Sequence, residues 1–145
     1  MSKVEDFLTP EEEQEVVSAI LQAEKNTSGE IRVHIEAHTR LEMLDRAKEV
    51  FHLLKMDNTK AENGVLIYIA VNDRKFAIYG DKGIDQVVPE NFWDNTKEVI
   101  RKDFITGNFK EGIINGVLKA GQELEEHFPW THGDTNELSN EISKG

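Results

Sequence analysis

The 145-residue sequence contains no cysteine, only three prolines and no apolar stretch long enough to cross a bilayer. The lack of cysteine excludes disulfides, thiolate zinc sites and cysteine nucleophiles. Basic residues are also scarce, since 17 Lys and Arg stand against 28 Asp and Glu, giving a formal net charge of −11. Such a chain cannot form a large basic face, so we expect no nucleic acid partner. The acidic, polar first residues lack the apolar core of a signal peptide, so we expect a cytoplasmic protein with no membrane contact.

Several catalytic and nucleotide-binding motifs are missing as well. The sequence has no GxGxxG, no GxxxxGK[ST] and no GxSxG, which argues against the dinucleotide fold, the P-loop and the nucleophile elbow. No DxD follows a predicted strand, so an aspartyl-phosphate mechanism lacks its nucleophile and acid. A phosphatase built from this chain would therefore have to use water activated by a metal ion.

What the sequence does contain is a hairpin pattern between Asn63 and Gly83. An unbroken apolar run, Val65–Val71, is rich in β-branched residues, as is typical of a strand buried on both faces. A polar turn, 72–74, separates it from a second strand, Lys75–Tyr79. We expect this hairpin to lie at the centre of the domain, with Asn63-Gly64 beside Gly80-Asp81 at the end opposite the turn.

Helical and alternating patterns surround the hairpin. Thr9 and Glu12 form a capping box that begins a helix ending near Asn26. Glu30–Glu36 alternates between apolar and polar residues and predicts a strand parallel to the first strand of the hairpin. A second helix is expected to be capped at Thr39 and to carry Leu44 to Leu54. A short edge strand is expected over 85–88. Two further helices are expected, one begun by Pro89 and reaching Phe104, and one over 109–128.

These elements predict an α/β fold, a three-layer α/β/α sandwich with a small mixed sheet of three to four strands flanked by helices. Residues 1–129 form one domain of ordinary length. Residues 130–145 are acidic and polar with few apolar side chains, and predict a disordered tail. We expect the protein to be a monomer.

The proposed topology brings oxygen-bearing residues together where the parallel strands start. The candidate ligands come from separate segments, namely Glu30, Asp57, Asn58, Asp81 and Asp85. Calcium prefers six to eight oxygen ligands in flexible geometry, some of them from backbone or water. Asp and Asn beside glycines are also ordinary turn formers, so both readings stay open on residue type alone. No contiguous stretch has the spacing of an EF-hand loop.

A rival site lies at the opposite end of the strand Glu30–Glu36. Glu36, His38 and Arg40 cluster there, close to Asn72-Asp73, and open α/β sheets bind ligands beyond the carboxyl ends of parallel strands. No glycine-rich loop supports this site, which makes it the weaker candidate. His34 shares the polar face of the strand with Arg32, and a histidine there is more often packed or capped than catalytic.

Four segments in this order resemble the TPM domain family, and together the resemblance covers about Phe7 to Pro129. The segments are TSGEIRVHIE at 27–36, MDNTKAENGVLIYIAVNDRKFAIYGDKGI at 56–84, FW at 92–93 and FKEGIINGV at 109–117. The resemblance implies an α/β/α sandwich, loops that bind calcium or another divalent cation such as Mg²⁺, and the acid phosphatase activity described for plant members.

The match to the family pattern is uneven along the chain. Gly29-Glu30 matches the start of the first strand, whereas Glu62-Asn63-Gly64 stands where relatives often have Asp-Asn-Gly. Gly80-Asp81-Lys82-Gly83 replaces the common Gly-Tyr-Gly and adds a carboxylate. We therefore hypothesise a divalent-cation site with weak metal-dependent hydrolysis of a small phosphoester; a non-catalytic adaptor that uses its acidic surface or tail is the alternative.

Overall fold

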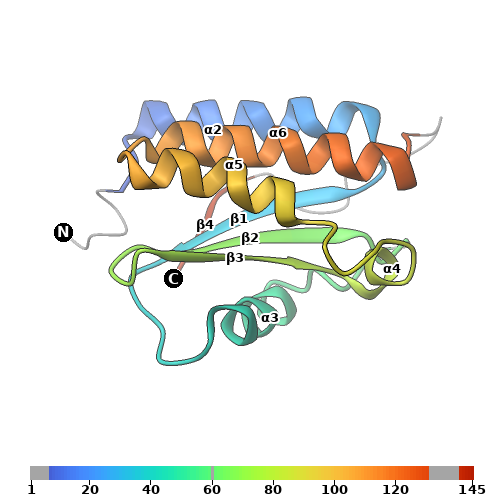
Figure 1. The fold of residues 1–145 in the computed structure, drawn as a ribbon, viewed down its shortest axis with the longest axis horizontal. Coiled ribbons are helices and arrows are strands. Elements are labelled where there is room, and N and C mark those ends of the chain that lie inside the picture. Colours follow the sequence, from blue (N-terminus) through green and yellow to red (C-terminus); the bar gives the residue numbers. More distant parts are fainter. Residues whose placement is uncertain (1–6, 60, 131–140) are drawn as a thin grey trace.

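A mixed four-stranded sheet separates two helical layers in the computed structural model, which describes residues 7–59, 61–130 and 141–145 (Figure 1). The strand order is β3-β2-β1-β4. The strands are β1 (Glu30–Glu36), β2 (Gly64–Ala70), β3 (Lys75–Gly80) and β4 (Ser143–Lys144). The predicted α/β/α sandwich with a small mixed sheet is confirmed.

The central hairpin forms as the hydrophobic pattern predicts. β2 is buried at all seven positions, because helices cover both faces of the sheet at this strand. It pairs antiparallel with β3 and parallel with β1, so that Ile67 lies between Val33 and Ile78. The parallel pair requires a crossover connection, which α3 (Met43–Leu53) supplies.

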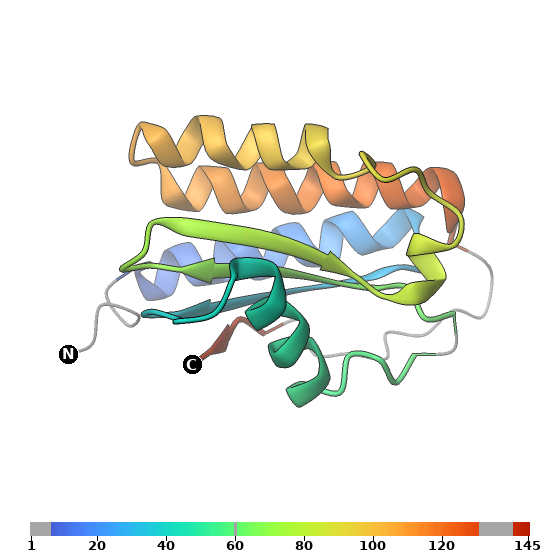
Figure 2. The same cartoon turned by 60° about the horizontal axis from the view of Figure 1, so that its bottom comes forward.

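Three long helices cover one face of the sheet, and α3 covers the other (Figures 1 and 2). The three are α2 (Pro10–Ala23), α5 (Asp94–Ile105) and α6 (Phe109–His127). The predicted capping box of α2 is present, since the Thr9 hydroxyl accepts from the Glu12 amide and the Glu12 carboxylate accepts from the Thr9 amide. α3 packs mainly on β3 and β2, and its Arg46 reaches β1 through an ion pair with Glu36.

Three local predictions are wrong. Thr39 does not cap α3, because its hydroxyl accepts from the Leu41 amide in a tight turn and the helix begins only at Met43. Pro89 does not open α5, which begins at Asp94 after a series of turns. The expected edge strand over 85–88 is also absent from the described structure, since α4 (Lys82–Asp85) turns the chain out of the sheet directly after β3.

The end of the chain differs from the expected disordered tail. Ser143 and Lys144 form β4, which pairs in parallel with His34 and Ile35 of β1, and the Gly145 amide donates to the Ile35 carbonyl at 2.9 Å. Residues 131–140, which hold most of the predicted tail, lie outside the described residues. Within the described part of the chain, no helix combines the length and apolar character needed to cross a membrane.

Candidate cation-binding rim and the polar row of β1

The rim is the edge of the sheet where β1 and β2 begin and β3 ends. Glu30 is paired with Gly64 at the start of the parallel ladder, and its amide donates to the Asn63 carbonyl at 3.3 Å. The Asp81 amide donates to the Gly64 carbonyl at 2.9 Å. Glu30 and Asp81 therefore flank Gly64 from its two sides, at the same edge of the sheet, as the sequence predicts.

Asp81 is the most unusual carboxyl group of the rim. Only 5% of the residue is exposed, and it is the N-cap of α4, where its Oδ1 accepts from the Lys82 amide at 2.8 Å. Its Oδ2 is buried and has no hydrogen-bond partner among the residues that the structure describes. Burial raises the pKa of Asp81; the bond from Lys82 opposes this rise, and the negative charges of Glu62 and Asp57 add to it.

Glu30, at the start of β1, is also buried, with 3% of the residue exposed. The carboxyl group of Glu24 lies close enough for the charge of Glu30 to act on it. Glu24, in the 3₁₀ turn η1 (Glu24–Asn26), accepts from the Ile31 amide through Oε2 at 2.8 Å. Burial raises the pKa of Glu24 to about 7; the bond from Ile31 opposes the rise, and the charge of Glu30 adds to it. Sequence reasoning missed Glu24, because it lies at the end of a helical pattern and carries no motif.

The other three predicted ligands are exposed. Asp57 lies 3.3 Å from the ring nitrogen Nδ1 of His52, and Asn58 follows it in the same loop. Asp85 ends α4, and burial raises the pKa of its carboxyl group even though much of the residue is open to solvent. In the described residues, no three or more His, Asp or Glu side chains form a group that could hold a metal by themselves. A cation at the rim would therefore depend on backbone and water oxygens as well.

A cleft of about 300 Å³ opens beside Asp85. Its wall combines carboxyl groups with largely buried aromatic rings, being lined by Asp85, Val88, Pro89, Glu90, Phe92 and Trp93. Gly80 brings this wall close to the rim, since a Cβ at that position would lie 3.4 Å from Nε1 of Trp93. The cleft thus adjoins the end of β3, one residue before Asp81.

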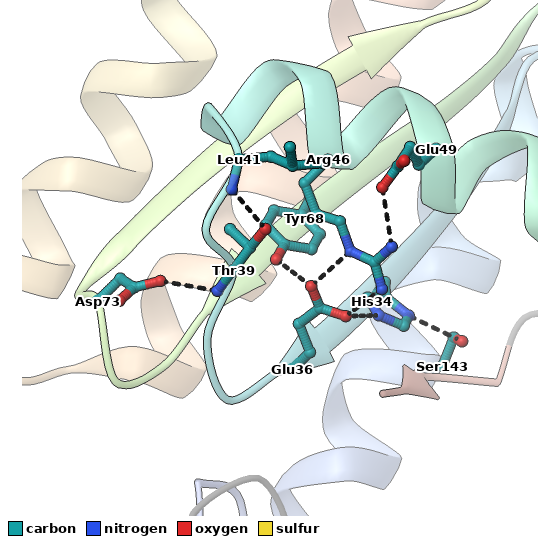
Figure 3. A network of polar contacts seen from close by, with 9 residues as sticks. All are labelled: His34, Glu36, Thr39, Leu41, Arg46, Glu49, Tyr68, Asp73 and Ser143. Atoms are coloured by element: carbon teal, nitrogen blue, oxygen red, sulfur yellow. Dashed lines mark hydrogen bonds and ion pairs between the residues drawn. The ribbon is translucent and has the colours of Figure 1, made fainter.

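The face of β1 that points towards the α3 side carries a polar row, defined as Glu30, Arg32, His34 and Glu36. Glu36 lies at the centre of a hydrogen-bonded network at the end of this row (Figure 3). Its carboxylate accepts from Nε and Nη2 of Arg46 at 2.8 and 2.9 Å, from the Tyr68 hydroxyl and from Nε2 of His34 at 3.1 Å. On the other side of the ring, Nδ1 of His34 lies 3.0 Å from Oγ of Ser143.

This network fixes the charge states of its members. Burial raises the pKa of Glu36, but the hydrogen bonds from Arg46, Tyr68 and His34 outweigh it and lower the pKa to about 2. Burial lowers the pKa of His34 despite the neighbouring Glu36, and the charges of Arg46 and Arg32 act in the same direction. A neutral ring that donates from Nε2 to Glu36 and accepts from Ser143 at Nδ1 satisfies both contacts. The described contacts of Arg46, Tyr68 and His34 converge on Glu36, as expected of a structural network.

The rival site from the sequence is divided by the structure. Glu36 belongs to the network just described, whereas Nδ1 of His38 lies 2.7 Å from the carboxylate of Asp73. Arg40 is exposed on the loop that leads to α3. The sequence pattern missed Arg46, Tyr68 and Ser143, which reach Glu36 and His34 from three other elements.

Comparison with known proteins agrees with this architecture. A family model for the TPM domain matches residues 1–123. The chain belongs to the TPM domain family. No curated protein matches it.

Three solved structures show how far the likeness extends. The BA42 protein from the psychrophilic bacterium Bizionia argentinensis, solved by NMR, is 59% identical, with a TM-score of 0.93 and full coverage of both chains. The N-terminal domain of a P. gingivalis protein is 21% identical with a TM-score of 0.65, and covers 87% of this chain and 83% of its own. The N-terminal domain of cg2496 from Corynebacterium glutamicum is 9% identical with a TM-score of 0.66, at 91% and 81% coverage. The last two show the fold alone.

Proposed function

We propose that this TPM domain binds a divalent cation at the rim, with Asp81 and Glu30 as its buried carboxylate ligands and calcium as the first candidate. The observation that carries the proposal is Oδ2 of Asp81, a buried carboxylate oxygen with no hydrogen-bond partner in the described part of the chain. A buried acceptor without a partner costs free energy. A bound cation would satisfy it.

Electrostatics support the same proposal. The pKa of Asp81 is raised by burial and by two neighbouring negative charges, so ionisation of this group is unfavourable without a compensating positive charge. Asp57, whose charge acts on Asp81, lies in one of the two segments next to the rim, and we expect Asp57, Asn58 and Asp85 to supply further or water-mediated oxygens. Calcium tolerates such a mixed, flexible shell, whereas Mg²⁺ requires octahedral geometry and keeps more of its water.

Calcium titration of chelator-stripped protein tests the proposal. We expect the backbone amide signals of 29–31, 57–64 and 80–85 to shift, and the melting temperature to rise, because a ligand at 100 times its Kd adds about 2.7 kcal/mol of stability. Asp81→Asn should weaken both effects at least tenfold while keeping the fold, since Asn also caps helices well. Asp45→Asn removes an exposed charge at the far end of α3 and should respond like the wild type. The absence of any response at millimolar calcium would rule the site out.

A second candidate function, metal-dependent hydrolysis of small phosphate monoesters, is favoured by the cleft beside Asp85. Its aromatic wall could hold the organic group of a substrate, and a carboxyl group of raised pKa is suited to accept a proton from water. Hydrolysis of an aryl phosphate should then need added metal and should fall at least tenfold in Asp81→Asn. Activity that persists unchanged in Asp81→Asn would point to a contaminating enzyme.

The adaptor hypothesis is the alternative to both. It predicts capture of a protein partner that neither chelator nor Asp81→Asn affects. The expected cytoplasmic location and monomeric state stay predictions, to be checked by cell fractionation and light scattering.

A further inference from the structure

Arg32 takes part in no ion pair with the described residues of this strongly acidic protein. It lies in the polar row of β1, half-buried, and its Nε is buried without a hydrogen-bond partner among the described residues. Two other arginines form ion pairs. Arg46 pairs with Glu36 and Glu49, and Arg101 pairs with Glu98. Arg40 and Arg74 also take part in no described ion pair, but both are exposed to solvent, whereas Arg32 is half-buried.

The position of Arg32 connects it to the rim. It follows Glu30 by two residues on the same face of β1, which places the two Cα atoms about 7 Å apart. β2 and β3 place Leu66 and Tyr79 beside it on that face, so neither of these two strands offers it a carboxylate. α3 makes its main contacts with the sheet at β3 and β2. The guanidinium therefore lies next to the rim, two residues along β1 from Glu30 and on the same face.

The chemistry of the group defines what it would bind. A guanidinium presents N–H donors in a fixed, planar fork that matches the oxygens of a carboxylate or phosphate, and such charge-assisted hydrogen bonds are among the strongest in proteins. An oxyanion at Arg32 would give Nε its partner. Its remaining oxygens would face the rim, where a divalent cation accepts oxygen ligands from carboxylates and from phosphate groups alike.

We propose that Arg32 binds an oxyanion, the phosphate or carboxylate group of a ligand, which it shares with the divalent cation at the rim. The inference rests on the proposed function for the shared part of the site, and the oxyanion binds Arg32 more tightly when the cation is present. Arg32 is thus the ligand-anchoring residue, and Asp81 and Glu30 are the cation-anchoring residues.

The test is a titration of the full chain with methyl phosphate and, separately, with acetate, each with and without saturating calcium. The ¹H–¹⁵N signal of the Arg32 Nε–H group reports directly on the contact. We expect this signal to shift with at least one of the two anions, and the apparent affinity to be at least tenfold higher with calcium. The anion that binds more tightly identifies the ligand class.

Variants separate the inference from the proposed function. Arg32→Gln should lower anion affinity at least tenfold and leave calcium affinity unchanged; Arg32→Lys should retain part of the binding, because a point charge replaces the fork. Arg40→Gln removes an exposed positive charge elsewhere and should behave like the wild type. If calcium binds normally but neither anion shifts Arg32, or Arg32→Gln binds the anions as the wild type does, the inference is wrong and the cation site stands. If the anion shifts Arg32 while calcium does not bind, the proposed function is wrong and the oxyanion site stands.

Discussion

Two carboxyl groups, one of Glu36 at the end of β1 and one of Glu24 in η1, have pKa values shifted in opposite directions. Glu36 is held ionised by three donors, with a pKa of about 2, whereas burial holds Glu24 towards its protonated form, with a pKa of about 7. The stability from Glu36 is present above its unfolded pKa, near 4.5, and is lost as the pH falls towards 2. The stability from Glu24 is complete below pH 4.5 and is lost as the pH rises through 7. Together they favour a stability maximum in mildly acidic solution.

Replacement of Glu24 by Gln tests this argument. The amide cannot ionise but still offers an oxygen to the Ile31 amide, so Glu24→Gln should be more stable than the wild type at pH 8, by up to about 3 kcal/mol, and equal to it near pH 4.5. Urea unfolding at several pH values measures the difference. Glu125→Gln, at an exposed position of α6, should show no such pH-dependent gain. A constant difference across the pH range would show that ionisation of Glu24 does not limit stability.

At the scale of elements, β4 is the shortest strand but closes an open edge. It covers the outer edge of β1 at His34 and Ile35, Ile142 beside it packs against the core, and Lys144 pairs with Glu13 of α2. An uncovered strand edge presents free N–H and C=O groups that can pair with another chain. β4 therefore ties the end of the chain to both the sheet and the helical layer.

A chain ending at Asn140 should be less stable than the full chain, by about 1–3 kcal/mol, because it loses the edge pairing and leaves His34 without its serine partner. We also expect it to self-associate as concentration rises. Urea midpoints and light scattering measure the two effects. Ser143→Ala is the matched control, since it removes only the side-chain bond and should cost about 1 kcal/mol or less without self-association. An unchanged midpoint in the shortened chain would mean that β4 contributes nothing to folding.

The sequence predicts these elements well where local signals agree. The capping box of α2 and the apolar run of β2 are each specified by consecutive residues, and both form as expected. The predicted helix cap at Thr39 is wrong because a threonine hydroxyl can accept a hydrogen bond in a turn as well as at the start of a helix. β4 could not be predicted from the sequence, because two polar residues carry no strand pattern. They adopt the strand conformation by pairing with the edge of β1, which lies more than a hundred positions earlier in the chain.

At the scale of the whole molecule, the place of the rim follows from topology. A parallel pair followed by a hairpin must bring the starts of β1 and β2 to the end of β3, so the neighbourhood of Glu30 and Asp81 could be read from the order of the strands. Which carboxyl groups are buried could not, because that depends on loops whose path the sequence does not reveal. Residue type alone does not distinguish the buried Asp81 from the exposed Asp57.

The packing of Trp93 against Gly80 gives the molecule an optical probe of its own. Trp93 is 9% exposed and lies next to the residue that precedes Asp81, whereas Trp130, the second indole of the chain, is 47% exposed. The fluorescence of the two residues therefore differs in wavelength. The buried Trp93 emits at shorter wavelength, and the solvent-exposed Trp130 emits at longer wavelength. Events at the rim can be followed in dilute, unlabelled protein by the shorter-wavelength component alone.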